Sequence, residues 1–93
     1  MPSVKARVAA QVGLHARPAA LFVRAVSETG QAVTISKAGR PPVDARSLLE
    51  VMTEDFPHNC EVELRLEDSG ALSAEAGVEL LEGLAEVLER PEQ

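Results

Sequence analysis

Alternation of apolar and polar residues predicts four strands in this chain. The clearest case is Val62, Leu64 and Leu66, which are separated by charged residues and would all face one side of a sheet. The same pattern, with turn signals between the segments, predicts strands over residues 3–9, 32–36, 40–43 and 60–67. Because Pro41 and Pro42 cannot donate to a ladder, we expect the strand at 40–43 to lie at a sheet edge.

Apolar residues at helical spacing predict two longer helices. Apolar residues such as Ala19, Phe22 and Val26 recur every three or four positions over 16–28, which predicts the first helix, and Gly30 suits the end of that helix. A second apolar stripe, opposed by a row of glutamates, predicts a helix that starts at Ser73 and ends before Pro91.

A capping box predicts a third, shorter helix after Ser47. In this motif the Ser47 hydroxyl accepts from the Glu50 amide, and the Glu50 side chain reaches back to the Ser47 amide. Leu48, Leu49 and Met52 lie on this helix, and on so short an element they cannot all point inward.

The predicted order is strand, helix, strand, strand, helix, strand, helix. Because strands and helices do not alternate regularly, this order predicts an α+β fold, with residues 1–93 forming a single domain. We expect an open-faced sandwich, that is, a four-stranded, mostly antiparallel sheet with three helices on one face. The other face would be polar and carry Lys5, Arg7, Thr34, Ser36, Glu61, Glu63 and Arg65.

The net charge of −6 is unevenly distributed along the 93 residues. Residues 61–93 contain two basic and ten acidic side chains, whereas residues 1–60 contain seven basic and five acidic ones. The acidity and the presence of only two aromatic residues argue against a nucleic-acid partner, which requires concentrated positive charge or exposed rings. The first two thirds can still present a local positive site, formed by Arg17, Arg24 and Arg46.

Cys60 is the only cysteine, so an internal disulfide is impossible and a reducing, cytoplasmic location is the simplest expectation. The chain shows no signal-peptide pattern and no apolar run of transmembrane length, so we expect no membrane insertion. His58 lies two residues before Cys60, but a zinc site needs three or four ligands. We therefore interpret this pair as a loop histidine and a small buried thiol, and expect no metal or cofactor.

The segment with the most distinctive chemistry is Gly13-Leu14-His15-Ala16-Arg17-Pro18-Ala19-Ala20. His15 lies at the start of the predicted helix, where backbone N–H groups lack internal partners and the helix dipole is positive. Pro18 fits the first turn without losing a helical hydrogen bond, and Arg17 adds a cation able to bind phosphate oxygens. The segment therefore favours an anion, such as a phosphoryl group, at His15.

This run resembles the active-site signature of the HPr family, the histidine phosphocarriers of the bacterial phosphoenolpyruvate-dependent sugar phosphotransferase system. The order of elements resembles the HPr fold over essentially the whole chain, and residues 43–53 resemble a second family segment. The resemblance implies that the Nδ1 atom of His15 accepts phosphoryl from enzyme I and passes it to sugar-specific IIA domains. It also implies that Arg17 stabilises the phosphoryl group and that the protein is a monomeric carrier rather than an enzyme.

The resemblance implies two further roles near the histidine. Ser47 matches a serine that a dedicated kinase phosphorylates in some bacteria, although the capping box already explains a serine at this position. The family binds its partners on an apolar patch around the histidine. Candidates for that patch here are Ala20, Arg24, Leu48 and Met52.

Other functions remain open on the sequence. One is an HPr-like regulatory or specialised-branch module, either nitrogen-related or linked to a dihydroxyacetone kinase. Several departures from the family pattern lie on or beside the expected docking patch and favour an altered choice of partner, namely Val12, Glu50, Glu54, Asp55 and Asn59. A serine–histidine hydrolase is disfavoured, because the chain has no nucleophile elbow and no evident acidic partner for His15.

Overall fold

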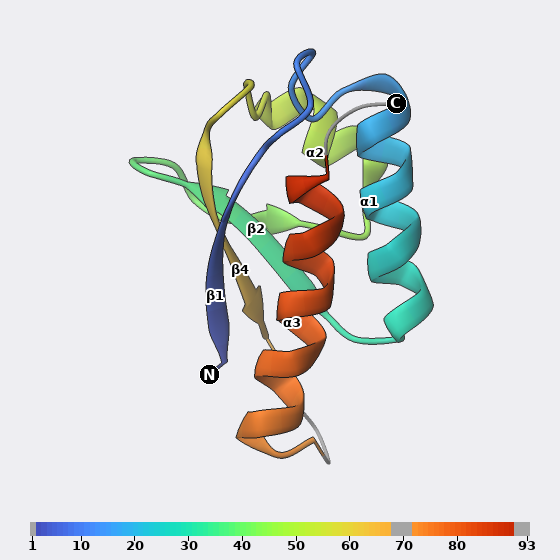
Figure 1. Cartoon of the computed structure of the whole chain (residues 1–93), viewed down its shortest axis with the longest axis vertical. Helices are drawn as coiled ribbons and strands as arrows, with labels where there is room; N and C mark the ends of the chain where they lie inside the picture. Colours follow the sequence, from blue (N-terminus) through green and yellow to red (C-terminus); the bar gives the residue numbers. More distant parts are fainter. Residues whose placement is uncertain (1, 68–71, 91–93) are drawn as a thin grey trace.

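The computed structural model describes residues 2–67 and 72–90, in which the chain forms one four-stranded sheet (Figure 1). Its strands are β1 (Ser3–Arg7), β2 (Val33–Lys37), β3 (Val43–Asp44) and β4 (Glu61–Leu66). They occur in the spatial order β1-β4-β2-β3, and every neighbouring pair is antiparallel. The edge position predicted for the strand after Pro41 and Pro42 is confirmed, since β3 is an edge strand. The turn predicted at residues 68–70 lies outside the described residues.

The register of the sheet explains the alternation seen in the sequence. Val4 and Ala6 of β1 pair with Leu64 and Val62 of β4, and Leu64 also pairs with Ile35 of β2. Because side chains alternate across a strand, these apolar residues all lie on the inner face of the sheet. Polar side chains occupy the opposite face, as predicted.

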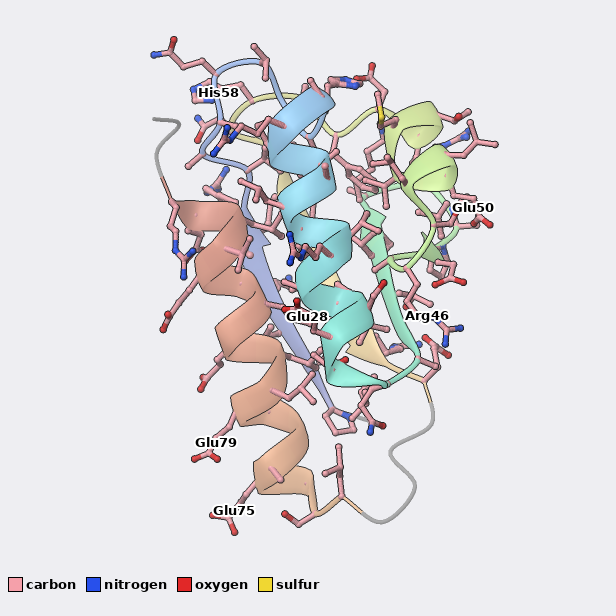
Figure 2. All side chains as sticks on the ribbon, turned by 90° about the vertical axis from the view of Figure 1, so that its right-hand side faces the viewer. Glu28, Arg46, Glu50, His58, Glu75 and Glu79 are labelled. Carbon is pink, nitrogen blue, oxygen red and sulfur yellow. The ribbon has the colours of Figure 1, made fainter. Side chains whose placement is uncertain are left out.

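Three helices cover the apolar face: α1 (Ala16–Thr29), α2 (Leu48–Glu54) and α3 (Ala74–Glu89). The two long helices α1 and α3 lie side by side, and the shorter α2 packs against α1 and β3 (Figures 1 and 2). The core between the layers is aliphatic apart from Phe22 and Phe56, which are completely buried. Glutamates of α3 such as Glu75 and Glu79 point away from the core (Figure 2). The molecule is therefore the open-faced α+β sandwich that the sequence predicted.

The prediction for the third strand was only partly right. A strand was expected over residues 40–43, whereas β3 covers only Val43–Asp44. Pro41 and Pro42 precede it, because neither has an N–H to donate to β2. All other helix and strand ends lie within two residues of their predicted positions.

The predicted capping box forms only in one direction. Glu50 N donates to Ser47 Oγ at 3.2 Å, as expected. The Glu50 carboxylate does not return to Ser47, because the Ser47 amide already donates to the Asp44 carbonyl at 3.0 Å. Glu50 Oε1 instead accepts from Asp44 N at 3.1 Å and so ties α2 to the edge strand.

Candidate functional site

His15 is the N-cap residue of α1. Its backbone is extended (φ −130°, ψ 166°), and its side chain makes no capping hydrogen bond. Helical hydrogen bonding begins with Ala19 N, which donates to His15 O at 3.3 Å. The amides of Ala16 and Arg17 therefore have no partner within the helix, and Pro18 has no amide at all. Because the first turn contains no acidic residue, the partial positive charge of this helix end is not offset there.

The backbone on both sides of His15 adopts left-handed conformations. Gly13 has a φ of 79° and Ala16 a φ of 49°. Gly13 also lies against the loop after α2, since a Cβ atom placed on it would lie only 2.8 Å from the carbonyl oxygen of Phe56. Leu14 N donates to that same oxygen at 2.8 Å. Glycine is thus required at position 13 both by conformation and by close approach, and the approach brings the α2 exit next to His15.

The imidazole of His15 contacts a carboxylate from this exit. Its Nε2 atom lies 2.8 Å from Oδ1 of Asp55, the C-cap residue of α2, which has a φ of 66°. We expected no acidic partner for His15 from the sequence, and that expectation was wrong. The two residues are 40 positions apart along the chain, so local sequence patterns could not pair them. The one available signal was Asp55 itself, which departs from the family pattern beside the expected docking patch.

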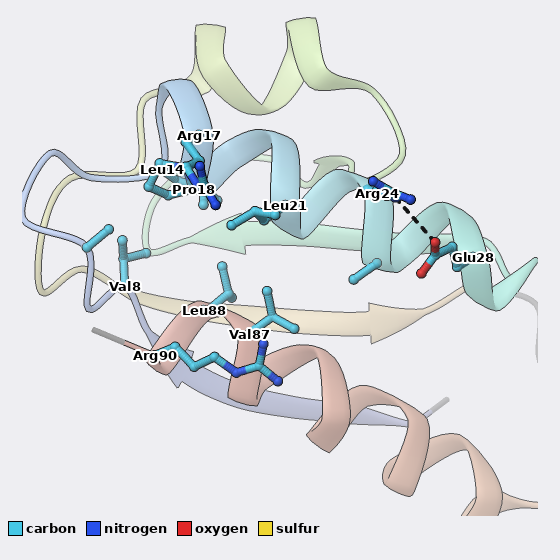
Figure 3. A pocket seen from close by; sticks show the side chains of 12 residues that line it. Val8, Leu14, Arg17, Pro18, Leu21, Arg24, Glu28, Val87, Leu88 and Arg90 are labelled. Carbon is cyan, nitrogen blue, oxygen red and sulfur yellow. Dashed lines mark hydrogen bonds and ion pairs between the residues drawn. The ribbon is translucent and has the colours of Figure 1, made fainter. Parts of the chain in front are cut away.

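Arg17 is exposed, and among the described residues its guanidinium makes no hydrogen bond or ion pair. Its side chain lines a groove of about 520 Å³ between α1 and α3 (Figure 3). Arg24 and Arg90 line the same groove, and Arg24 Nε lies 3.4 Å from a carboxylate oxygen of Glu28. Arg17 therefore lies on the first turn of α1 as predicted, without a described contact to the His15 ring.

Helix α2 exposes most of its apolar side chains. Leu49 is 77% exposed, Leu48 40% and Met52 37%, whereas Val51 is buried. We call the first three residues the α2 patch. Leu49 was not among the docking residues expected from the sequence, because helical spacing alone does not say which face of so short a helix is covered.

The two docking candidates on α1 are also exposed. Ala20 and Arg24 both face solvent, but Arg24 lies in the groove between α1 and α3. All four predicted docking residues are thus accessible, and Arg24 belongs to the groove described above.

Two carboxylates near α2 have lowered pKa values. A hydrogen bond from Arg46 N, helped by the Arg46 guanidinium, lowers the pKa of Asp44. A side-chain hydrogen bond from Arg40, with Nε 2.9 Å from Oε2, lowers the pKa of Glu54. Both carboxyl groups therefore stay ionised to a lower pH than they would without these hydrogen bonds.

His58 is exposed in the loop before β4, where its Nδ1 donates to the carbonyl of Ala10 at 3.1 Å (Figure 2). Cys60, the other half of the histidine–cysteine pair, is half-buried against the core. Within residues 2–67 and 72–90, no group of three or more His, Cys, Asp or Glu side chains is arranged to hold a metal ion.

Comparison with known proteins identifies the relatives of this chain. The model of the family described as the PTS HPr component phosphorylation site matches residues 2–89. The phosphocarrier protein HPr of Streptomyces coelicolor is 46% identical over 82 residues, covering 83% of this chain and 85% of that protein.

Solved structures lead to the same relatives. HPr-C-His from Thermoanaerobacter tengcongensis is 30% identical with a TM-score of 0.74, and 96% of each chain is covered. The phosphocarrier protein HPr from Bacillus anthracis is 26% identical with a TM-score of 0.70, covering 92% of this chain and 94% of that one.

The sandwich fold and the histidine at the start of α1 thus define a phosphocarrier protein. Within that class, the chain belongs to the HPr family of the phosphotransferase system. None of the helices in the described part of the chain could span a membrane.

Proposed function

We propose that this protein accepts a phosphoryl group on Nδ1 of His15 from enzyme I and passes it to sugar-specific IIA domains. The observation that carries the proposal is the position of His15 as the N-cap of a 14-residue helix whose first turn has neither a side-chain cap nor an acidic residue. A histidine in this place can form a phosphoramidate next to backbone N–H groups and a positive helix end. Membership of the HPr family supports the same reaction.

Acceptance is a substitution at phosphorus. The lone pair of Nδ1 forms a bond to phosphorus, and the bond between phosphorus and the donor nitrogen of enzyme I breaks. The amides of Ala16 and Arg17 supply donors for the phosphoryl oxygens, and the Arg17 guanidinium supplies a permanent cation. Passing the group onward is the reverse process, with IIA as the attacking partner, so the protein ends each cycle unchanged and acts as a carrier.

The direct test is to incubate the protein with enzyme I, phosphoenolpyruvate and magnesium, and to measure acid-labile phosphate. We expect one phosphoryl group per chain and complete loss of labelling in His15→Ala. His58→Ala is the matched control, since it removes the other histidine, and it should label normally. Labelling that persists in His15→Ala and disappears in His58→Ala contradicts the assignment.

The same proposal includes docking of partners on the α2 patch. Leu48 is 40% exposed, so Leu48→Glu should weaken binding to enzyme I while leaving the free energy of unfolding nearly unchanged. Val51→Glu is the contrasting variant, because Val51 is completely buried and an unpaired charge there should unfold the protein. Titration of enzyme I, followed by calorimetry and by thermal melting of each variant, separates the two roles. Unfolding by Leu48→Glu would show that the patch is structural.

The proposal extends to the regulation and location of the protein. A serine kinase acting on Ser47 would add negative charge at the N-cap of α2, a place where the helix dipole tolerates an anion. Ser47→Asp should then slow acceptance from enzyme I, while Ser47→Ala should leave it unchanged. A monomeric, cytoplasmic carrier is the form that fits these partners, and size-exclusion chromatography checks its oligomeric state.

A further inference from the structure

The contact between His15 and Asp55 joins two segments that the backbone holds together. Leu14 N donates to Phe56 O at 2.8 Å, one residue away from each member of the pair. On the other side, Lys37 Nζ from β2 donates to the carbonyl oxygen of Asp55. The Asp55 carboxylate is therefore presented to the imidazole from a backbone that is fixed by two neighbouring elements.

The contact adds little to the stability of the fold. The side chain of His15 is 35% exposed and that of Asp55 66% exposed. Charged hydrogen bonds between exposed side chains contribute weakly to folding, because water competes for both groups. What such a contact can still do is to select one orientation and one protonation pattern of the ring.

The chemistry of the two groups fixes that pattern. An ionised carboxylate can only accept a hydrogen bond, so Nε2 of His15 carries the proton. In the neutral ring the proton then cannot be on Nδ1, which retains its lone pair. We propose that Asp55 is a positioning residue for phosphoryl acceptance, holding the His15 ring and its Nε2–H tautomer so that Nδ1 is the free nucleophile. This inference rests on the proposed function of His15.

The proposal also accounts for charge in the reaction. When Nδ1 bonds to phosphorus, the electron pair of the broken bond goes to the donor nitrogen of enzyme I. The proton on Nε2 stays in place, so the imidazole of His15 becomes an imidazolium that carries the phosphoryl group. The carboxylate of Asp55 lies 2.8 Å from Nε2 and offsets that new positive charge. No proton has to move during acceptance.

The conformation of Asp55 provides clean variants for a test. Its φ of 66° favours glycine, and asparagine and aspartate also tolerate this region. Asp55→Gly therefore removes the carboxylate without backbone strain. Asp55→Asn keeps a carbonyl oxygen that can accept from Nε2–H but removes the charge. Glu79→Gln, on the outer face of α3, is the control for loss of one negative charge elsewhere.

The first experiment needs no phosphate. Nitrogen-15 NMR of the whole protein at alkaline pH, where imidazoles are neutral, reports the tautomer of His15 directly. We expect the Nε2–H form in the parent, in Asp55→Asn and in Glu79→Gln, and a clear rise of the Nδ1–H form in Asp55→Gly. An unchanged tautomer ratio in Asp55→Gly overturns the proposal.

The second experiment measures the rate of acceptance from phosphorylated enzyme I. Asp55→Gly should slow acceptance about five-fold, the rate equivalent of about 1 kcal/mol, and Asp55→Asn should fall between this variant and the parent. Glu79→Gln should match the parent. Equal rates in the parent and Asp55→Gly reject the positioning role while leaving the proposed function intact. If the parent itself accepts no phosphoryl group, the proposed function fails, and Asp55 retains only the tautomer control seen by NMR.

Discussion

The three helices in residues 2–67 and 72–90 begin in two different ways. Helices α2 and α3 start after serines, Ser47 and Ser73, whose hydroxyls accept from the amide three residues further on, at 3.2 Å and 3.1 Å. Each also has a glutamate in its first turn, Glu50 or Glu75. Helix α1 starts with His15, whose side chain makes no capping bond, and its first turn has no acid.

This difference separates two capped helix starts from one that is left uncapped. At α2 and α3 the chain itself satisfies one of the free amides and offsets the dipole, which makes the helix more stable. At α1 the amides and the dipole stay available to an outside anion. The proposed phosphoryl group on His15 is such an anion, so α1 lacks the usual cap at the point where the proposed function requires an open helix start.

The largest effect that we predict is a slower rate of phosphoryl acceptance when the positive charge beside the start of α1 is removed. Arg17→Ala should slow acceptance from enzyme I by about 10²–10³, the usual loss when one contact to a developing anion is removed. Arg65→Ala is the matched control, because Arg65 is an exposed arginine on the polar outer face of the sheet and is not one of the predicted docking residues. Quenched-flow assays of phosphoryl acceptance, together with thermal melting curves of both variants, test this prediction. Similar rates in the two variants would remove Arg17 from the site.

The next effect concerns the backbone that leads into the open start. Gly13→Ala should lower the free energy of unfolding by about 1–3 kcal/mol through the left-handed φ, with a further loss from the clash with Phe56 O. Gly39→Ala separates the two contributions, since Gly39 has the same φ of 79° but no atom within 4 Å of the added Cβ. Urea denaturation of both variants should show the larger loss for Gly13. Equal losses would mean that the approach to Phe56 is not tight.

A smaller effect compares the helix starts directly. Ser47→Ala and Ser73→Ala should each lower the free energy of unfolding by about 1 kcal/mol, because each removes a side-chain cap. His15→Ala removes no cap and should have a much smaller effect on stability. Chemical denaturation of the three variants makes the comparison. A loss in His15→Ala as large as in the serine variants would show that His15 stabilises α1 after all.

The smallest effect concerns pH and the far end of α2. The pKa of Glu54 is lowered in the folded protein by its hydrogen bond from Arg40, so the unfolded chain takes up the proton first as the pH falls. The stability that this pair contributes is therefore complete above about pH 5 and is lost as the pH falls through the lowered pKa. Arg40→Gln should reduce that acid-induced loss. An identical pH profile for the variant and the parent would contradict the pairing.

Much of the fold could be predicted from the sequence, because the signals are local. The period of two at Val62, Leu64 and Leu66 predicts a half-buried strand, and the result is β4, one of the two interior strands of the sheet. Gly30 was expected to end α1, and it does so with a φ of 70°. The start of α1 near His15 was also predictable, because it depends on adjacent residues. Pro18 fits the first turn of a helix, and the sequence has no acidic residue in that turn.

The parts that could not be predicted depend on tertiary contacts. The Ser47 amide donates to the Asp44 carbonyl and is therefore not available to the Glu50 side chain. The spacing of Ser47 and Glu50 alone could not show this competing hydrogen bond. Asp55 meets His15 only because the loop after α2 closes on Gly13. The direction of Arg17, towards the groove with α3, depends in the same way on where α3 packs.

The pairing of β1 with β4 has a consequence for how the protein folds during synthesis. Ser3 pairs with Arg65, so the first strand has no neighbour in the sheet until most of the chain has left the ribosome. Contacts that are so distant along the chain form late, because a long loop must close before they are made. His15 meets Asp55 only after a closure across 40 residues, which include α1, β2, β3 and α2. We therefore expect His15 to be translated early but to become competent for the proposed phosphoryl acceptance late, and a nascent chain that stops before β4 to be inert towards enzyme I.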